Sequence, residues 1–310
     1  MSEVDIFLIG VPKAGTTWLA NTLNQHKEII LSDPKEPNII ASHKGTFIRQ
    51  NESPDWEKLE TCFQGEGLRL DASIHAFACP LAPSRIRERL PEAKFILCLR
   101  EPVSRSYSHW NMVLNTKEAE TNNVDWSTFE KAWNDNHLKE DSLYATSMSR
   151  WLDQFSLERF LIINSFDLKN DPTEVLIKIE NFLGINNSEY DLSSTRHSNS
   201  AAGRRPISKT GKLVRIFFSI IPNIIKKPIV KLLQKRDLNI YNLPLLSNKG
   251  EEHHIDSGAY SICGKELVEE LLLFEQLTNF PTTKWIDKIN LEIKQAEKFI
   301  LPYDKPGDVS

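Results

Sequence analysis

The stretch Asp5-Ile6-Phe7-Leu8-Ile9-Gly10-Val11-Pro12-Lys13-Ala14-Gly15-Thr16-Thr17-Trp18-Leu19 decides the fold of this chain. Its apolar run at 6–9 is typical of a strand covered on both faces, and Leu19 and Leu23 have the spacing of a helix over residues 16–26. A glycine-bearing turn between a buried strand and a helix directs backbone N–H groups and the positive helix end toward one point. The stretch therefore predicts an anion-binding loop in an α/β protein.

The rest of the chain continues this alternation of strands and helices. Buried strands are predicted at 94–99 and 160–163, and helices at 83–90, 102–114, 143–155 and 172–182. The alternation favours a central parallel sheet flanked by helices, followed after a Ser- and Asn-rich loop at 186–206 by a helical C-terminal subdomain. Length alone allows one or two domains. We expect a single domain over 1–310, with an α/β catalytic body at 5–206 and a helical part at 207–300.

The position of the lysine in the loop separates two chemistries. Gly10 and Gly15 have the glycine spacing of a nucleoside-triphosphate loop, but Thr16 follows Gly15 and the lysine stands at position 13. A triphosphate enzyme needs its lysine after the second glycine, together with an acidic residue for magnesium. Neither of the two predicted strand ends here supplies an obvious acidic metal ligand, since the strand at 94–99 leads into Arg100. A nucleotide kinase or NTPase with a degenerate loop therefore remains only as the alternative from a different class.

Two sequence blocks resemble the PAPS-dependent sulfotransferases, where PAPS is 3′-phosphoadenylyl sulfate. Pro12 to Leu19 is similar to the P-K-x-G-T-T-W-L phosphosulfate loop, and Leu97 to Ser108 is similar to the block of a strand followed by R-[DE]-P-x-x-R-x-x-S. Lys35-Glu36-Pro37 resembles the K-E-P segment of the polysaccharide, or heparan-sulfate-type, branch. The resemblance implies a P-loop-like sulfotransferase fold, and it covers residues 5–206 and more weakly reaches Trp285.

The resemblance also implies the ligands and the residues that hold them. PAPS would be the sulfate donor and 3′-phosphoadenosine 5′-phosphate (PAP) the product, with no metal required. Arg100 and Ser108 would hold the 3′-phosphate, since arginine with a hydroxyl suits a dianion. The implied residues of the phosphosulfate loop are Pro12, Lys13, Ala14, Gly15, Thr16, Thr17 and Trp18, and those of a C-terminal basic loop that closes over the nucleotide are Gly203, Arg204 and Arg205.

Sulfuryl transfer needs a group that neutralises the leaving phosphate and a base that takes the acceptor proton. The resemblance implies Lys13 for the first task and Glu36 for the second, with His75 as the alternative base because small-molecule members use a histidine upstream of the arginine strand. Glu36 could instead stand near a helix start, where the helix dipole favours a carboxylate, and His75 could be structural. Asn38-Ile39-Ile40 replaces the aromatic residues that usually follow K-E-P.

We therefore expect an O-sulfotransferase that acts on an acceptor hydroxyl, with a carbohydrate preferred. A lipid or small-molecule hydroxyl with His75 as base is the alternative within the class. A catalytically inactive member that serves as a binding module is a third possibility, although Lys13 and Glu36 are both retained. At the strand end after Ile163, Asn164-Ser165-Phe166-Asp167-Leu168 departs from the Tyr-Glu-Asp-Leu of many members.

The charge of the chain is strongly segregated. The formal net charge of −4 argues against nucleic acid as a partner, yet residues 192–236 carry eleven Lys and Arg and no Asp or Glu. This segment predicts either short helices with solvated basic edges or a wall for a charged polysaccharide, and residues 213–236 could contact an anionic membrane.

The cysteines and histidines indicate free thiols and no metal site. Cys62, Cys79, Cys98 and Cys263 form no C-x-x-C pair, and His253 and His254 have no second spaced pair, so no metal site is expected. The longest uncharged apolar stretch has ten residues, against roughly 20 for a membrane span. With no basic leader before the first strand, we expect a soluble, cytoplasmic protein.

Trp133, Trp151 and Trp285 are predicted in the core. Packing is also the predicted role of Trp110, although it could border the acceptor cleft.

Overall fold

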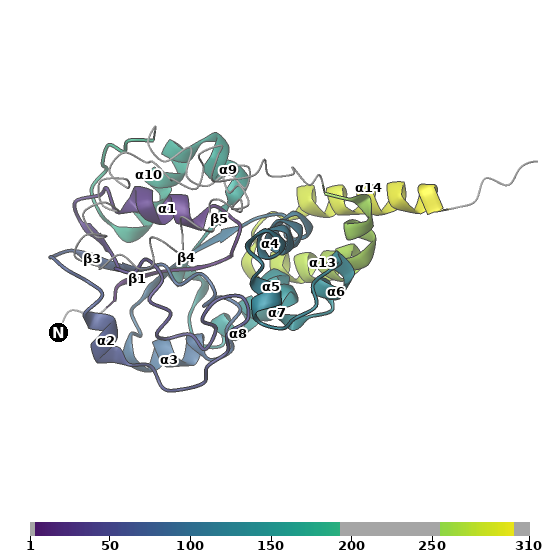
Figure 1. Ribbon diagram of the computed structural model, residues 1–310. Coiled ribbons are helices and arrows are strands. Elements are labelled where there is room, and N and C mark those ends of the chain that lie inside the picture. The colour runs from purple at the N-terminus through teal and green to yellow at the C-terminus, as the bar shows by residue number, and fades with distance from the viewer. Residues whose placement is uncertain (1–3, 193–254, 301–310) are drawn as a thin grey trace, which may run out of the picture.

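A five-stranded parallel sheet forms the centre of the molecule (Figure 1). The computed structural model describes residues 4–192 and 255–300, with side chains as far as residue 297. The strand order is β2-β3-β1-β4-β5, with bounds β1 Ile6–Gly10, β2 Ile29–Leu31, β3 Leu68–Asp71, β4 Lys94–Leu99 and β5 Phe160–Asn164. The predicted α/β class and the strands at the positions of β1, β4 and β5 are confirmed. The short strands β2 and β3 were not predicted.

Helices cover both faces of this sheet. Figure 1 shows α1, α9 and α10 on one face and α2 and α3 on the other. The helices before the C-terminal part are α1 Thr16–Leu23, α2 Trp56–Glu60, α3 Ala82–Arg89, α4 Pro102–Thr116, α5 Glu118–Thr121, α6 Phe129–Trp133, α7 Asn136–Lys139, α8 Tyr144–Leu152, α9 Ser165–Asn170 and α10 Pro172–Leu183, with 3₁₀ turns η1 Glu140–Ser142 and η2 Leu157–Arg159. Each predicted helix is present, and the largest differences are at the ends of α1 and α8, which stop three residues early.

Helix starts follow from local capping. Proline begins α4 and α10, where its missing N–H has no intrahelical role. The side chain of Glu101 accepts hydrogen bonds from the backbone N–H groups of Val103 and Ser104 at the start of α4, and Asp171 accepts from Glu174 at the start of α10. These caps fix the start of each helix, α4 after β4 and α10 after α9.

A helical hairpin ends the described chain and packs beside α4, α6 and α8 (Figure 1). It consists of α13 Ser257–Thr278 and α14 Thr283–Ile300. A Cβ atom at Gly264 of α13 would lie only 2.8 Å from Ile293 and 2.9 Å from Ile289 of α14, so glycine permits the close approach of the two helices. The predicted helical character is confirmed over 257–300, while the predicted boundary at 206/207 lies outside the described residues.

Aromatic side chains fill the core between β4, β5 and α8. Trp151 packs edge-on against Phe95 and Phe160, with ring centroids 4.9 and 6.0 Å apart, and its Nε1 donates to the carbonyl of Phe77 at 3.0 Å. Trp133, Trp151 and Trp285 are buried as predicted. Trp110 donates to the carbonyl of Trp126 at 2.9 Å and packs on the same core, which supports the packing role.

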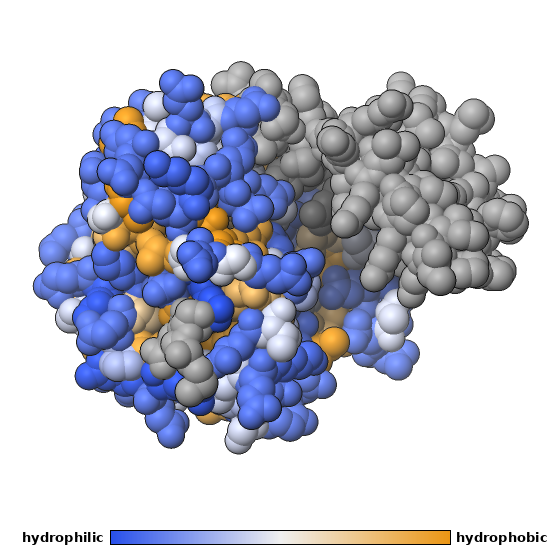
Figure 2. Space-filling view, turned by 90° about the vertical axis from the view of Figure 1, so that its left-hand side faces the viewer, coloured by the Kyte–Doolittle hydropathy of each residue, from blue (hydrophilic) through white to orange (hydrophobic). Residues whose placement is uncertain are grey.

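The surface carries its hydrophobic residues in small patches. Figure 2 shows the face at the left of Figure 1, where orange patches lie between hydrophilic side chains. Within the described ranges, no helix is both long enough and apolar enough to span a bilayer. All four cysteines are buried and carry free thiols.

Replacing Trp151 tests the aromatic core. We expect Trp151→Ala to lower the free energy of unfolding by about 3–5 kcal/mol, because a large buried ring and its hydrogen bond are lost together. Denaturant unfolding followed by circular dichroism measures the change. Phe166→Ala is the matched control, since this ring is 69% exposed. A loss at Trp151 no larger than that at Phe166 would contradict the account.

Candidate active site

The candidate site lies at the carboxyl ends of β1 and β4, which pair side by side. The chain leaves β1 through α1 toward one edge of the sheet, and it leaves β4 through α4 toward the other edge. Ligands of open α/β sheets bind at such a reversal of strand order, because the two departing segments leave a crevice between them. The predicted phosphosulfate loop and Arg100 both lie there.

The loop from β1 to α1 has the backbone conformation of an anion cradle. Lys13 and Gly15 have φ angles of 73° and 88°, and successive residues with left-handed and ordinary backbone angles turn N–H groups inward. Helix α1 begins at Gly15 without a side-chain cap, so its first N–H groups face the loop. Any residue with a side chain would be strained at this positive φ. Its Cβ atom would also lie 3.2 Å from the side chain of Leu168.

The remaining predicted loop residues are mostly turned inward. Pro12, Ala14 and Thr16 are buried, whereas Thr17 and Trp18 are half-buried. The Cys98 thiol donates to the carbonyl of Ala14 at 2.9 Å, which fastens the loop to β4. The loop therefore presents mainly backbone groups, Lys13 and the partly open Thr17 and Trp18.

Arg100 and Lys13 meet at this point. The guanidinium of Arg100 donates to the main-chain carbonyl of Lys13 at 3.2 Å, and burial lowers the pKa of Arg100. Because arginine has five N–H donors, one bond to a carbonyl leaves others for a phosphate. The ammonium of Lys13 lies 3.6 Å from the sulfur of Met112 on α4. Ser108 is half-buried and stands one helical turn before Met112, so it shares the face of α4 that Lys13 approaches.

Glu36 lies in a loop that follows β2 and is fastened to β3. Its carboxylate pairs with Lys35 at 2.5 Å. The backbone N–H of Ala72 donates to the carbonyl of Lys35 at 3.3 Å, and the N–H of Asn38 donates to the hydroxyl of Ser73 at 3.0 Å. No helix begins at Glu36, so the alternative interpretation of Glu36 as a residue at a helix start is wrong.

The residues after Glu36 turn away from solvent. Ile40 is buried and Ile39 packs against the core. Lys44 donates to the carbonyl of Ile39 at 3.0 Å and to that of Asn38, which has a φ of 52°. The apolar replacements of the usual aromatic residues are therefore core side chains at this position.

Asp71 is a site residue that the sequence analysis missed. It ends β3 beside β1, and β3 was not predicted; β1 and β4 end at Gly10 and Leu99, without an acidic residue, as expected. The carboxylate is 2% exposed and accepts the N–H of Ser73 at 2.8 Å. Burial, and to a smaller extent the charge of Glu36, raise the pKa of Asp71 to about 6. The missed signal is the short, partly polar strand Leu68–Asp71, which lacks an apolar run.

His75 belongs to a buried cluster around Asp141, which also was not predicted. The Asp141 carboxylate lies 3.6 Å from His75, 3.6 Å from His109 and 3.7 Å from Arg105. Although burial alone would raise it, the interaction with His75 and the charge of Arg105 hold the pKa of Asp141 below its usual range. Burial lowers the pKa of His109 well below its usual value, and Thr46 lies within hydrogen-bond distance of its ring.

The second arginine of the R-E-P-x-x-R block has a structural role. Arg105 is fully buried and donates to the hydroxyl of Ser142 at 2.6 Å and to the carbonyl of Leu138 at 2.9 Å. Arg100 is half-buried and borders the loop. The sequence block alone does not distinguish these roles, because Arg100 and Arg105 both lie within a few residues of Pro102, one before it and one after it.

Several predicted residues lie outside the described part of the chain. These are Gly203, Arg204 and Arg205 of the basic loop, the segment 213–236, and His253 and His254. The expectations for them stay predictions.

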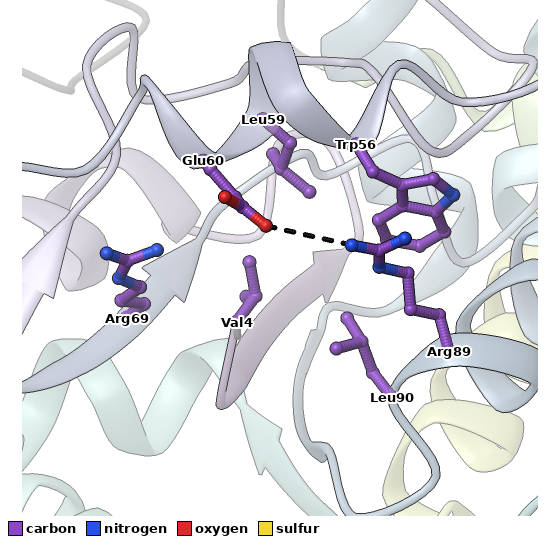
Figure 3. Close-up of a pocket in the computed structure, with 7 residues that line it drawn as sticks. All are labelled: Val4, Trp56, Leu59, Glu60, Arg69, Arg89 and Leu90. Carbon is purple, nitrogen blue, oxygen red and sulfur yellow. Dashed lines mark ion pairs between the residues drawn. The ribbon is translucent and has the colours of Figure 1, made fainter. Parts of the chain in front are cut away.

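Two pockets in the described part of the chain lie at the opposite, amino-terminal end of the sheet. Figure 3 shows the smaller, where Arg89 lies over the ring of Trp56 at 5.2 Å and pairs with Glu60 at 3.7 Å. The larger, of about 270 Å³, is bordered by Ile6, Leu68 and Lys94 near the starts of β1, β3 and β4. Neither pocket includes a predicted site residue, so they do not compete with the site at the carboxyl ends.

Comparison with known proteins agrees with this architecture. The family described as sulfotransferase domain matches residues 3–206, so the chain belongs to the sulfotransferase family. A sulfotransferase from Alicyclobacillus acidocaldarius has a similar structure, with a TM-score of 0.57 over 92% of this chain and 99% of that chain. At 16% sequence identity, this likeness concerns the fold.

Curated relatives act on heparan sulfate according to their names. Mouse heparan sulfate glucosamine 3-O-sulfotransferase 5 is 27% identical over 201 residues, which are 60% of this chain and 55% of the relative. The bifunctional heparan sulfate N-deacetylase/N-sulfotransferase 1 of Caenorhabditis elegans is 24% identical over 191 residues, 58% of this chain and 22% of the relative. The chain thus spans about half the length of the first relative and less of the second.

The titration of Asp71 predicts a pH-dependent stability. Its folded pKa of about 6 is above the ordinary value of 3.8, so the stability it contributes is full below pH 3.8 and is lost as pH rises through 6. Because asparagine does not titrate, we expect the free energy of unfolding of Asp71→Asn, relative to that of wild type, to rise by up to about 3 kcal/mol from pH 4 to pH 8. Denaturant unfolding at the two pH values measures the change.

Asp125→Asn is the control with the opposite sign. Lys131 lowers the pKa of the exposed Asp125, so its contribution is present above pH 3.8 and is lost as pH falls. A difference between wild type and Asp71→Asn that does not change with pH would contradict the assigned titration.

Proposed function

We propose that this protein is a PAPS-dependent O-sulfotransferase that acts on a carbohydrate hydroxyl. The observation that carries the proposal is the meeting of Lys13 and Arg100 at the carboxyl ends of β1 and β4, beside the face of α4 that holds Ser108. One loop of backbone N–H groups and two side-chain cations suit a ligand with two separate phosphate groups. PAPS would supply the sulfuryl group in this site.

Each group then has a distinct task. The N–H groups at Thr16 and Thr17 would bind the 5′-phosphate, and Lys13 would neutralise the negative charge that grows on the leaving oxygen. Arg100 and Ser108 would hold the 3′-phosphate. The half-buried position of Arg100 strengthens its interaction with an anion, because less water screens the charge.

Glu36 is our proposed general base. Its carboxylate contacts Lys35, and the bonds from Lys35 and Asn38 to residues 72 and 73 hold this loop against the end of β3. A carboxylate held in a fixed place can accept the proton of an acceptor hydroxyl within reach.

His75 is the alternative base, and its contact with Asp141 at 3.6 Å supports that role. A neighbouring carboxylate would orient the ring and stabilise the imidazolium that forms when the ring takes a proton. This alternative belongs with a lipid or small-molecule hydroxyl as the acceptor.

The carbohydrate acceptor is supported by the printed names of the relatives and by the K-E-P segment. The position of Asp71 is the observation that best suits the NTPase alternative, because an acidic residue at a strand end can hold magnesium. Its raised pKa, its burial and the place of Lys13 before the second glycine all weigh against that function.

Substitution of the two cations tests the donor site. We expect Lys13→Met and Arg100→Met each to lower sulfate transfer from labelled PAPS by at least about 100-fold, since each removes a fixed charge from the phosphates. Lys178→Met, on the exposed face of α10, should keep wild-type activity. A fully active Lys13→Met enzyme would refute the assignment.

A paired comparison distinguishes the two bases. We expect Glu36→Gln to reduce kcat by about 100-fold or more with little change in Tm. His75→Gln should change kcat less than about tenfold and lower Tm, because it disturbs the buried cluster around Asp141. The reverse pattern would identify His75 as the base and favour the small-molecule alternative.

A further inference from the structure

The carboxylate of Glu101 connects the donor site to the C-terminal hairpin. Glu101 follows Arg100 directly and is 6% exposed. Its Oε1 accepts the N–H of Val103 at 2.8 Å, and its Oε2 accepts the N–H of Ser104 at 3.0 Å. The same Oε2 accepts from the hydroxyl of Tyr260 and from the ammonium of Lys288, both at 3.3 Å. One carboxylate thus joins the start of α4 to both helices of the hairpin.

These contacts form a mutually supporting group that we call the Glu101 clamp, made of Glu101, Ser104, Tyr260 and Lys288. Lys288 also donates to the hydroxyl of Ser104 at 3.3 Å and lies 5.6 Å from the ring centre of Tyr260. A buried carboxylate needs such partners, because removal from water disfavours its charge. The clamp therefore joins Glu101 to Tyr260 and Lys288, which lie 159 and 187 positions further along the chain.

The hairpin also holds Arg100 from a second side. The hydroxyl of Tyr144 donates to the main-chain carbonyl of Arg100 at 2.7 Å. The ring of Tyr144 packs edge-on against Phe274 of α13, with centroids 6.0 Å apart. The backbone of Arg100 is thus held through its own carbonyl and through its neighbour Glu101, and both contacts lead to the hairpin.

We propose that the α13–α14 hairpin is a positioning element of the nucleotide site, and that it sets the place of Arg100 for recognition of the 3′-phosphate. This inference rests on the proposed role of Arg100. The hairpin lies beyond residues 3–206, the part that the family description matches. Phosphate recognition by a guanidinium depends on its direction as well as its charge, so a small displacement weakens it.

The test compares two nucleotides that differ only in the 3′-phosphate. The ratio of Kd for adenosine 5′-phosphate to Kd for PAP, from calorimetry on the full chain, measures what the 3′-phosphate contributes. We expect Lys288→Met to lower this ratio by about threefold and Tyr260→Phe/Lys288→Met by about tenfold. The Kd for adenosine 5′-phosphate should change less than twofold, and Lys288→Arg should restore most of the ratio.

Controls separate positioning from stability. Lys265→Met removes an exposed lysine of the same hairpin, 80% exposed and 4.0 Å from Glu297, and should leave the ratio at the wild-type value. A merely structural clamp would lower Tm in the Lys288 and Tyr260 variants with the ratio unchanged, and that result overturns the inference. If the double variant does not fold, Lys288→Met alone decides, since Lys288 is 45% exposed. A wild-type ratio near one would instead overturn the proposed function, which distinguishes the two failures.

Discussion

The parallel pairing of β1 with β4 is the constraint on which the site depends. It places the ends of two strands that are far apart in the sequence side by side, and the turn after β1 is then fastened to β4 by two bonds. The N–H of Val11 donates to the carbonyl of Cys98 at 2.8 Å, and the thiol of Cys98 donates to the carbonyl of Ala14. Without this attachment, the backbone N–H groups of the loop and Arg100 would have no common point at which to bind an anion.

Buried charges then hold helix α4 in place. Arg105, on α4, forms a buried pair with Asp141, and Glu101 caps the start of the same helix. Breaking a buried pair costs about 3–5 kcal/mol, because one charge is left without compensation. The half-buried Ser108 on α4 therefore keeps its position relative to Lys13.

The sequence was sufficient for the parts of the fold that have a local pattern. Continuous apolar runs identified β1, β4 and β5, and the glycines with Lys13 identified the turn between β1 and α1. Strand β3 was missed because Arg69 and Asp71 interrupt its apolar pattern. Asp141 and the contacts of Glu101 with Lys288 were missed for another reason: they join segments that only the folded chain brings together, and no spacing in the sequence marks them.

The central claim is that the site at the ends of β1 and β4 binds a 3′-phosphorylated adenosine nucleotide and not a nucleoside triphosphate. The direct measurement is isothermal titration calorimetry of the wild-type chain with PAP in EDTA, compared with ATP in magnesium. The account predicts that PAP binds at least about tenfold more tightly than ATP and that magnesium does not strengthen PAP binding. Tighter binding of magnesium–ATP than of PAP would contradict it and would favour a triphosphate enzyme.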